Sequence, residues 1–192
     1  MRFTISSLVA AALALTHLAT ATPLSPRQEA LKPFEVTATT YSAPNGRPGS
    51  YPWITIRANV TDPNSYTFTS GDTVGTVPAG ISGLNCLAQW YPNEYAEGRS
   101  YPCDQAEKGH WVMQTLAGDE GSFFGSNFRL RFIHVVEPGQ LIQEFRARVE
   151  GEALFKAGID GTTSYSCAGS GSCGASLRNE LKPLLVPVTR TV

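Results

Sequence analysis

The residues best suited to chemistry lie in one segment, 90–107, which combines carboxylates with aromatic rings. Its acidic residues are Glu94, Glu97, Asp104 and Glu107, and its large aromatic residues are Trp90, Tyr91, Tyr95 and Tyr101. Two carboxylates at a suitable separation hydrolyse glycosidic bonds, and aromatic rings commonly line ligand sites. The segment therefore predicts either a sugar-binding or hydrolytic cleft, or a solvated loop whose rings cover the edge of the core. The solvated loop is favoured, because such segments usually run over the surface.

A second group of charged residues consists of arginines that alternate with apolar residues in two strand-like runs. They are Arg129, Arg131, Arg146 and Arg148. If the runs pair as a hairpin, the guanidinium groups share an outer face and are candidate binding residues, because they suit carboxylates, phosphates and protein interfaces. A solvated polar face that deters edge-to-edge association explains the same pattern and is the commoner outcome.

The cysteines predict disulfide bonds. There are four, Cys86, Cys103, Cys167 and Cys173. An even number in a secreted protein indicates disulfides, and four cysteines allow three pairings. We favour Cys86–Cys103 with Cys167–Cys173, because each closes a local loop. Zinc is disfavoured because neither CxxC nor His-x-x-x-His spacing occurs, so we expect no metal and no cofactor.

No motif of a common enzyme class occurs in the sequence. A nucleophile elbow, a phosphate-binding loop, a dinucleotide fingerprint and a His-Glu-x-x-His helix are all missing. His110 and His134 lie in strand-like runs, and His134 shares a face with Phe128 and Leu130. Each is interpreted as a histidine of a sheet rather than a general base. We therefore predict no catalytic residue and no enzyme activity.

From Pro33 onward, strand-length runs alternate with turn residues, which predicts antiparallel β structure. The predicted strands are 34–41, 53–60, 66–68 with 74–77, 86–90, 110–116, 128–132 and 145–149. A type II turn is predicted at 137–140, a small mobile loop at 167–173, a helical turn or two at 175–181 and a closing edge strand at 185–188. Together they predict an all-β fold, a single antiparallel β-barrel or β-sandwich with local disulfide loops.

The N-terminal residues have the order of parts of a secretory signal. Arg2 precedes an apolar run, 8–18, and the small residues Ala19-Thr20-Ala21 follow. The run is too short to span a bilayer, and no second long apolar stretch follows, so no membrane span is expected. We predict a signal peptide over 1–21, a flexible leader over 22–32 and a secreted, extracellular β domain over 33–192.

The charge is balanced, with 15 Lys and Arg against 16 Asp and Glu. No net field attracts a polyanion, so nucleic acid is not an expected partner. Asn59-Val60-Thr61 is an N-glycosylation sequon, and strand alternation places Asn59 on an outward face. Asn59 is therefore the candidate glycan acceptor.

The chain resembles the Alternaria major-allergen-like family of small secreted fungal proteins over most of its mature length. The likeness rests on the leader 23–28, on 86–89 with Cys103 as a nearby partner, on the aromatic strand 111–116, and on the second local pair Cys167 and Cys173. It implies a compact extracellular β-barrel without established catalysis that acts at the interface with a host. Known members link a dimer through a cysteine before the position of Cys86. This chain has none there, so we expect no covalent dimer.

The function expected from these observations is that of a secreted, non-catalytic β-barrel interaction protein, effector-like or allergen-like. Its partner would be a host protein or a cell-wall glycan. The alternative is a carbohydrate-binding or carbohydrate-hydrolysing β protein that uses the Trp90–Glu107 loop.

Overall fold

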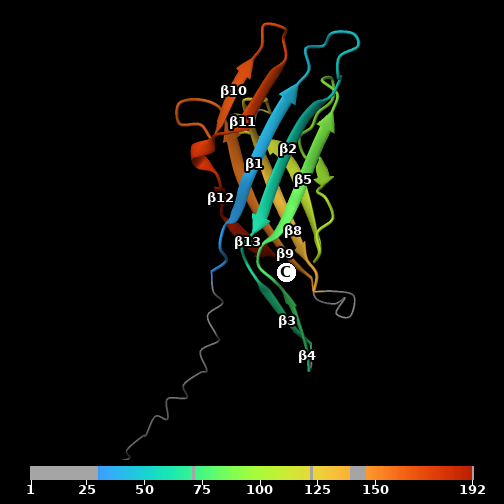
Figure 1. Ribbon diagram of the computed structural model, residues 1–192, viewed down its shortest axis with the longest axis vertical. Coiled ribbons are helices and arrows are strands. Elements are labelled where there is room, and N and C mark those ends of the chain that lie inside the picture. The colour runs from blue at the N-terminus through green and yellow to red at the C-terminus, as the bar shows by residue number, and fades with distance from the viewer. Residues whose placement is uncertain (1–29, 71, 122, 139–145, 192) are drawn as a thin grey trace, which may run out of the picture. The chain divides into compact units, whose positions relative to one another are not determined.

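The computed structural model describes residues 30–70, 72–121, 123–138 and 146–191, and residues from Leu31 onward form one compact unit (Figure 1). The predicted signal peptide and residues 22–29 of the predicted leader lie outside the described residues. No helix within the described ranges is long and apolar enough to cross a lipid bilayer. The unit is built almost entirely of antiparallel strands, as the sequence predicts.

The strands form two separate larger sheets and one small hairpin. The first sheet has the order β10-β11-β1-β2-β5, with β12 also beside β1. Its members are β1 (Phe34–Ala43), β2 (Ile54–Asp62), β5 (Ile81–Trp90), β10 (Thr163–Cys167), β11 (Cys173–Leu177) and β12 (Leu184–Val186). The second sheet has the order β13-β9-β8-β7-β6. Its members are β6 (Ser100–Pro102), β7 (His110–Ala117), β8 (Asn127–Val136), β9 (Ala147–Lys156) and β13 (Val188–Thr191).

The hairpin of β3 (Tyr66–Ser70) and β4 (Thr73–Val77) pairs Tyr66 with Val77, which confirms the predicted short pairing. Each large sheet keeps its own edges among the described strands, so the fold is a β-sandwich, one of the two predicted alternatives.

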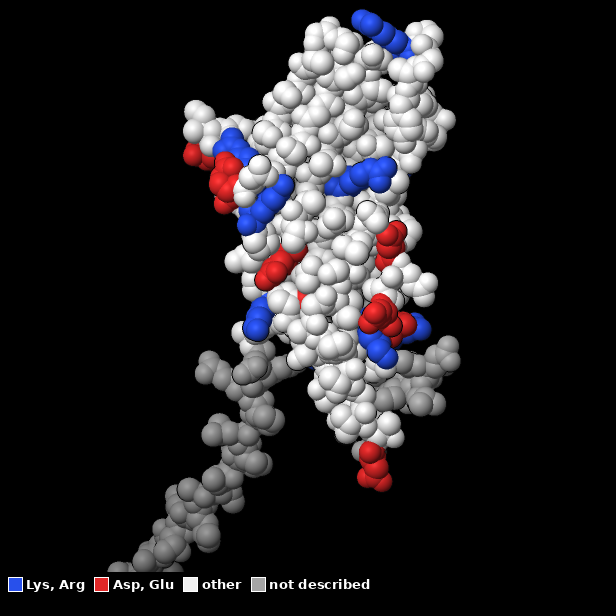
Figure 2. Space-filling model, viewed as in Figure 1, with Lys and Arg blue, Asp and Glu red and all other residues white. Residues whose placement is uncertain are grey.

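The core lies between the two large sheets and follows from the alternation of apolar and polar residues along each strand. Ile56 and Val60 of β2 are fully buried, as are Leu130 and Phe132 of β8. Phe34 of β1 meets Trp111 of β7 edge to face, with ring centroids 5.0 Å apart. Most charged residues take outward positions, and Figure 2 shows acidic and basic side chains dispersed over one face between larger uncharged areas.

A buried polar cluster lies at the end of β2, around the carboxylate of Asp62. Asp62 Oδ2 is 2.7 Å from His134 Nδ1, and both side chains are fully buried. The Tyr66 hydroxyl donates to the same oxygen over 2.7 Å. The backbone N–H and Nδ2 of Asn64 donate to Asp62 Oδ1 over 2.9 and 2.8 Å. Burial, followed by the hydrogen bond to Asp62, raises the pKa of Tyr66, so its phenol remains a donor.

The same cluster fixes the chain just before β1. Lys32 N–H donates to Asn64 Oδ1 over 2.8 Å, and Asn64 Nδ2 donates to the Lys32 carbonyl over 2.9 Å. His134 also stacks on the indole of Trp111, with centroids 4.4 Å apart and nearly parallel rings. His134 is therefore a core residue, as predicted, and its acidic partner comes from the opposite sheet.

The hairpin predicted around the arginines is present as β8 and β9. Phe128 pairs with Phe155 and Val136 pairs with Ala147, so both strands are longer than the predicted runs. Residues 139 and 140 of the predicted turn at 137–140 and Phe145 of the predicted second strand lie outside the described residues.

The prediction of a helical turn or two at 175–181 is wrong for its first residues. Residues 175–177 belong to strand β11 rather than to a helical turn, because Ala175 and Leu177 alternate into the interior and Ala175 pairs with Tyr41 of β1. Only η3 (Asn179–Leu181) forms a single 3-10 turn. The predicted loop at 167–173 is present as the tip of the β10–β11 hairpin, where Cys167 pairs with Cys173, and its mobility stays a prediction.

The predicted closing strand at 185–188 is two strands that join different sheets. β12 pairs with β1, whereas β13 pairs with β9. Pro187 lies between them and has no N–H to donate to either ladder. The chain therefore passes from one sheet to the other at this proline.

We expect Asp62→Ala to lower the free energy of unfolding by about 3–5 kcal/mol, because it leaves the buried polar groups of His134, Tyr66 and Asn64 without their acceptor. Urea denaturation followed by tryptophan fluorescence measures the change. Asp160→Ala removes an exposed carboxylate and should stay within about 0.5 kcal/mol of the parent protein. Equal effects of the two substitutions would contradict a stabilising role for the cluster.

Candidate functional site

A cavity of about 480 Å³ lies at the end of the sandwich where β2 begins, away from Asp62 at the other end of that strand. Its walls come from β1, β2, β5, β10, the loop after β5 and the loop before β8. In Figure 1 the arrowheads of β1, β5 and β10 point towards this end. Six aromatic residues line the cavity: Tyr41, Trp90, Tyr95, Phe123, Phe124 and Tyr165.

The aromatic residues form a buried floor and an exposed rim. Trp90 is buried and meets Phe123 edge to face, with centroids 5.7 Å apart. At the rim, Tyr95 is 89% exposed and Phe124 is 63% exposed. Gly125 permits the loop before β8 to approach closely, since a Cβ there would come within 2.1 Å of the Tyr41 ring. A ligand in the cavity would therefore meet ring surfaces from several directions.

Two carboxylates, those of Glu94 and Glu97, are the only charged side chains among the described residues that line the cavity. Glu94 forms an ion pair with Arg99, in which Glu94 Oε2 lies 2.9 Å from Arg99 Nη1. No ion pair involves Glu97 within the described ranges. Burial, with a smaller contribution from Tyr165, raises the pKa of Tyr41 to about 12, so its phenol is neutral at physiological pH.

Only part of the acidic and aromatic segment 90–107 lies at the cavity. Four of its residues line the cavity: Trp90, Glu94, Tyr95 and Glu97. The other four do not, and they are Tyr91, Tyr101, Asp104 and Glu107. Tyr91 instead stacks on Trp53 with centroids 3.8 Å apart, and Tyr101 packs against the core. The predicted acidic aromatic segment is thus partly a cavity wall, partly the strand β6 with Tyr101 against the core, and partly a surface loop.

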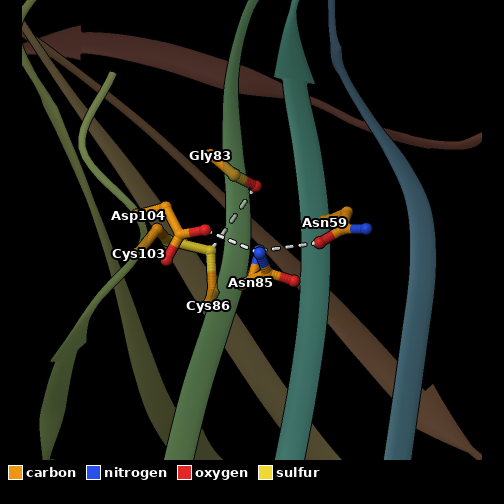
Figure 3. The surroundings of a disulfide bond; sticks show 6 residues. All are labelled: Asn59, Gly83, Asn85, Cys86, Cys103 and Asp104. Carbon is orange, nitrogen blue, oxygen red and sulfur yellow. Dashed lines mark hydrogen bonds between the residues drawn. A yellow bond between two sulfur atoms is a disulfide. The ribbon is translucent and has the colours of Figure 1, made fainter.

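The first predicted disulfide, Cys86–Cys103, links β5 to the chain after β6 (Figure 3). Asn85 beside it has a positive φ of 50° and bridges two segments. Its N–H donates to Asn59 Oδ1 over 2.9 Å, and its Nδ2 donates to Asp104 Oδ2 over 2.6 Å. These bonds fix the end of the loop that begins at the cavity. Asn59 is partly exposed, and its glycosylation stays a prediction.

The second predicted disulfide, Cys167–Cys173, closes the edge hairpin of β10 and β11. The Tyr165 hydroxyl lies 3.4 Å from Cys167 Sγ, and Tyr165 lines the cavity. Each disulfide therefore fixes a segment that contributes to a cavity wall. All four cysteines of the chain form bonds within it.

The four arginines predicted as binding residues are each matched by a carboxylate. On β8, Arg129 lies 3.6 Å from Asp119 and Arg131 lies 2.5 Å from Glu152. Arg146 pairs with Glu137 at 3.0 Å, and Arg148 pairs with Glu150 at 2.5 Å. The arginines do project outward as the alternation predicts, but neighbouring acids balance their charge. The cavity is therefore the stronger candidate site.

Sequence reasoning missed much of the cavity because its walls come from distant parts of the chain. Tyr41 and Tyr165 belong to strands of the first sheet, and Phe123, Phe124 and Gly125 precede β8. The one local signal was the adjacent pair Phe123 and Phe124 in a segment that contains two glycines. Two neighbouring large apolar rings in a turn-like segment indicate a binding surface.

Comparison with known proteins identifies no relative: the chain matches no family model, no curated protein and no solved structure. Within the described ranges, no three His, Cys, Asp or Glu side chains are grouped so that they could hold a metal ion. The interpretation of the cavity therefore depends on its own residues.

Alkaline titration tests the environment of Tyr41. A tyrosine in an unfolded chain loses its proton near pH 10, whereas Tyr41 keeps its proton to about pH 12. The stabilisation of the folded state by the protonated Tyr41 phenol is complete below about pH 10 and is lost as the pH rises through about 12. Tyr41→Phe should therefore reduce the fall in unfolding free energy across this interval, measured by urea unfolding at several pH values. Tyr66 adds a fall of the same sign, so part of the loss will remain.

The matched control for that titration is Tyr51→Phe, which removes a phenol that is 59% exposed. An identical pH dependence for Tyr41→Phe and the parent protein would contradict the assigned environment.

Removing the disulfides separately should destabilise the protein to different degrees. The Cys86→Ala/Cys103→Ala variant opens a link across 17 residues and should lose roughly 3 kcal/mol of unfolding free energy. The Cys167→Ala/Cys173→Ala variant opens a link across 6 residues and should lose roughly 2 kcal/mol. Urea denaturation measures both losses. Peptide mapping of the unreduced parent protein checks the pairing, and crossed peptides would refute it.

Proposed function

We propose that the protein is a secreted, non-catalytic binding protein that holds a host or cell-wall glycan in the cavity at the end of its sandwich. The observation that carries the proposal is a cavity of about 480 Å³ with aromatic walls and an exposed aromatic rim. Sites for small ligands typically measure roughly 300–1,000 Å³ and combine apolar walls with a few polar groups. This cavity has that size and that chemistry.

A sugar is the ligand that suits these walls best. A pyranose ring has an apolar C–H face and a rim of hydroxyl groups. The exposed rings of Tyr95 and Phe124 offer flat surfaces for the C–H face. The Tyr41 phenol and the Glu97 carboxylate offer a donor and acceptors for the hydroxyls. Large apolar rings exposed together usually mark a binding surface.

Binding is proposed rather than hydrolysis because of where the two carboxylates lie. Hydrolysis by a carboxylate pair needs one member to be kept protonated, which requires buried and apolar surroundings. Glu94 and Glu97 are both exposed, and Glu94 is ion-paired with Arg99. Neither has the surroundings that a general acid needs.

An extracellular location is supported by two independent features. Both disulfides suit an oxidising compartment. The order of residues 1–21 is that of a signal peptide. The two local cysteine pairs also support the proposed relationship to the Alternaria major-allergen-like family, and with it an effector-like or allergen-like role at a host surface.

A glycan array tests the proposed function. The protein is purified from the medium of a secreting host and should bind a subset of host or cell-wall glycans. Tyr95→Ala and Phe124→Ala should each weaken binding by about tenfold or more, because truncating an aromatic anchor typically has an effect of that size. Tyr51→Ala removes an exposed ring that does not line the cavity and should bind as the parent protein does.

Two results would contradict parts of this proposal. Failure to bind any glycan, or unchanged binding by both rim variants, would remove glycan binding at the cavity. Release of new reducing ends from a bound oligosaccharide would show that the protein is a hydrolase.

A further inference from the structure

We infer that the cavity selects sugars that carry a free ammonium group, such as glucosamine units without their acetyl groups. This inference rests on the proposed function, because it assumes that the cavity holds a glycan. It goes further by naming the charge of the sugar, which follows from the combination of carboxylates and ring faces around the cavity.

The charge of the cavity walls is negative. Glu94 and Glu97 are the charged residues among the described wall residues, and the wall contains neither lysine nor arginine within that set. Arg99 balances Glu94 from outside the wall. Glu97 forms no ion pair with the described part of the chain, so its charge is available to a ligand.

The ring faces favour a cation as well. An aromatic face attracts an ammonium group that lies within about 6 Å of the ring centre. Tyr95 lies between the two glutamates in sequence, and Phe124 contributes a second exposed ring to the same cavity. An ammonium group would thus meet carboxylates and ring faces together. A neutral sugar would use the rings and hydrogen bonds without the attraction of opposite charges, and a uronic acid would be repelled by Glu97.

The carboxylates are held by a loop that is fixed to the second sheet. Ala96 is buried, and its carbonyl accepts a hydrogen bond from the Thr115 hydroxyl of β7. Gly98 N–H donates to the Thr115 carbonyl over 2.7 Å, and Thr115 N–H donates to the Arg99 carbonyl over 3.0 Å. The loop between Glu94 and Arg99 therefore has a set conformation before a ligand arrives, which lowers the entropy lost on binding.

Two chitin-derived oligosaccharides of equal length provide the test, one fully N-acetylated and one fully deacetylated. Isothermal titration calorimetry is run at a pH where the amines are protonated. The deacetylated oligomer should bind the parent protein about tenfold more tightly at low salt, and added NaCl should reduce this preference because it screens exposed charges. An oligomer of uronic acid should bind more weakly than either.

Matched variants locate the source of the preference. Glu97→Gln keeps the shape of the side chain and one acceptor oxygen but removes its charge. It should remove most of the preference, because the affinity for the deacetylated oligomer falls towards that for the acetylated one. Glu107→Gln removes an exposed carboxylate of the same segment that does not line the cavity, and should keep the preference. Circular dichroism spectra and thermal unfolding confirm that both variants fold.

The outcomes separate this inference from the proposed function. Equal affinity for the two oligomers, or a preference that survives Glu97→Gln, overturns the inference and leaves glycan binding in place. Absence of binding to both oligomers and to every array glycan overturns both. Tighter binding of the uronic acid oligomer overturns the charge selection alone.

Discussion

The carboxylate of Asp62 joins the two sheets of the sandwich at one end. It ends β2 of the first sheet, faces His134 of β8 in the second, and accepts the hydroxyl of Tyr66 at the start of β3. A charge buried without partners would cost several kcal/mol, so the surrounding positions must supply donors in fixed places. Asn64 does so from the same turn and also holds Lys32 ahead of β1. The hydrogen bonds around the Asp62 carboxylate thus fix three parts of the fold together: the chain before β1, the contact between the two sheets, and the start of the β3–β4 hairpin.

The opposite end of β2 is organised in a different way. There the core ends in aromatic rings rather than in a polar cluster, and loops held by two disulfides surround a cavity. Exposed rings such as those of Tyr95 and Phe124 contribute little to folding. Because the buried core and the disulfides stabilise the fold, the exposed rings at the cavity end of the sandwich are not needed for stability and can suit a ligand instead.

Alternation along single strands could be read from the sequence because it has a period of two residues and needs no knowledge of the neighbours. It placed His134 inside and Arg129 and Arg131 outside, as observed. The disulfides could be predicted because their cysteines are close in the chain. Contacts between distant segments could not be. Asp62 and His134 are 72 positions apart, and no local pattern pairs them.

The same limit explains the errors near the C-terminal strands. Ala175 and Leu177 belong to a strand because β11 pairs with β1. The strands on either side of Pro187 join different sheets, so their separation could be seen only once both sheets were known. The cavity combines five segments that are remote from one another in sequence, and the sequence analysis identified residues of only one of them, 90–97.

The pairing of β1 has a consequence for how the chain is made. β1 lies inside its sheet, with β2 on one side and β11 and β12 on the other. β2 follows it closely, but Leu184–Val186 of β12 leave the ribosome only after nearly all of the domain has been synthesised. Until then one edge of β1 has no partner and can pair with other chains. The first sheet is therefore completed only once Leu184–Val186 have been synthesised, long after β1 and β2.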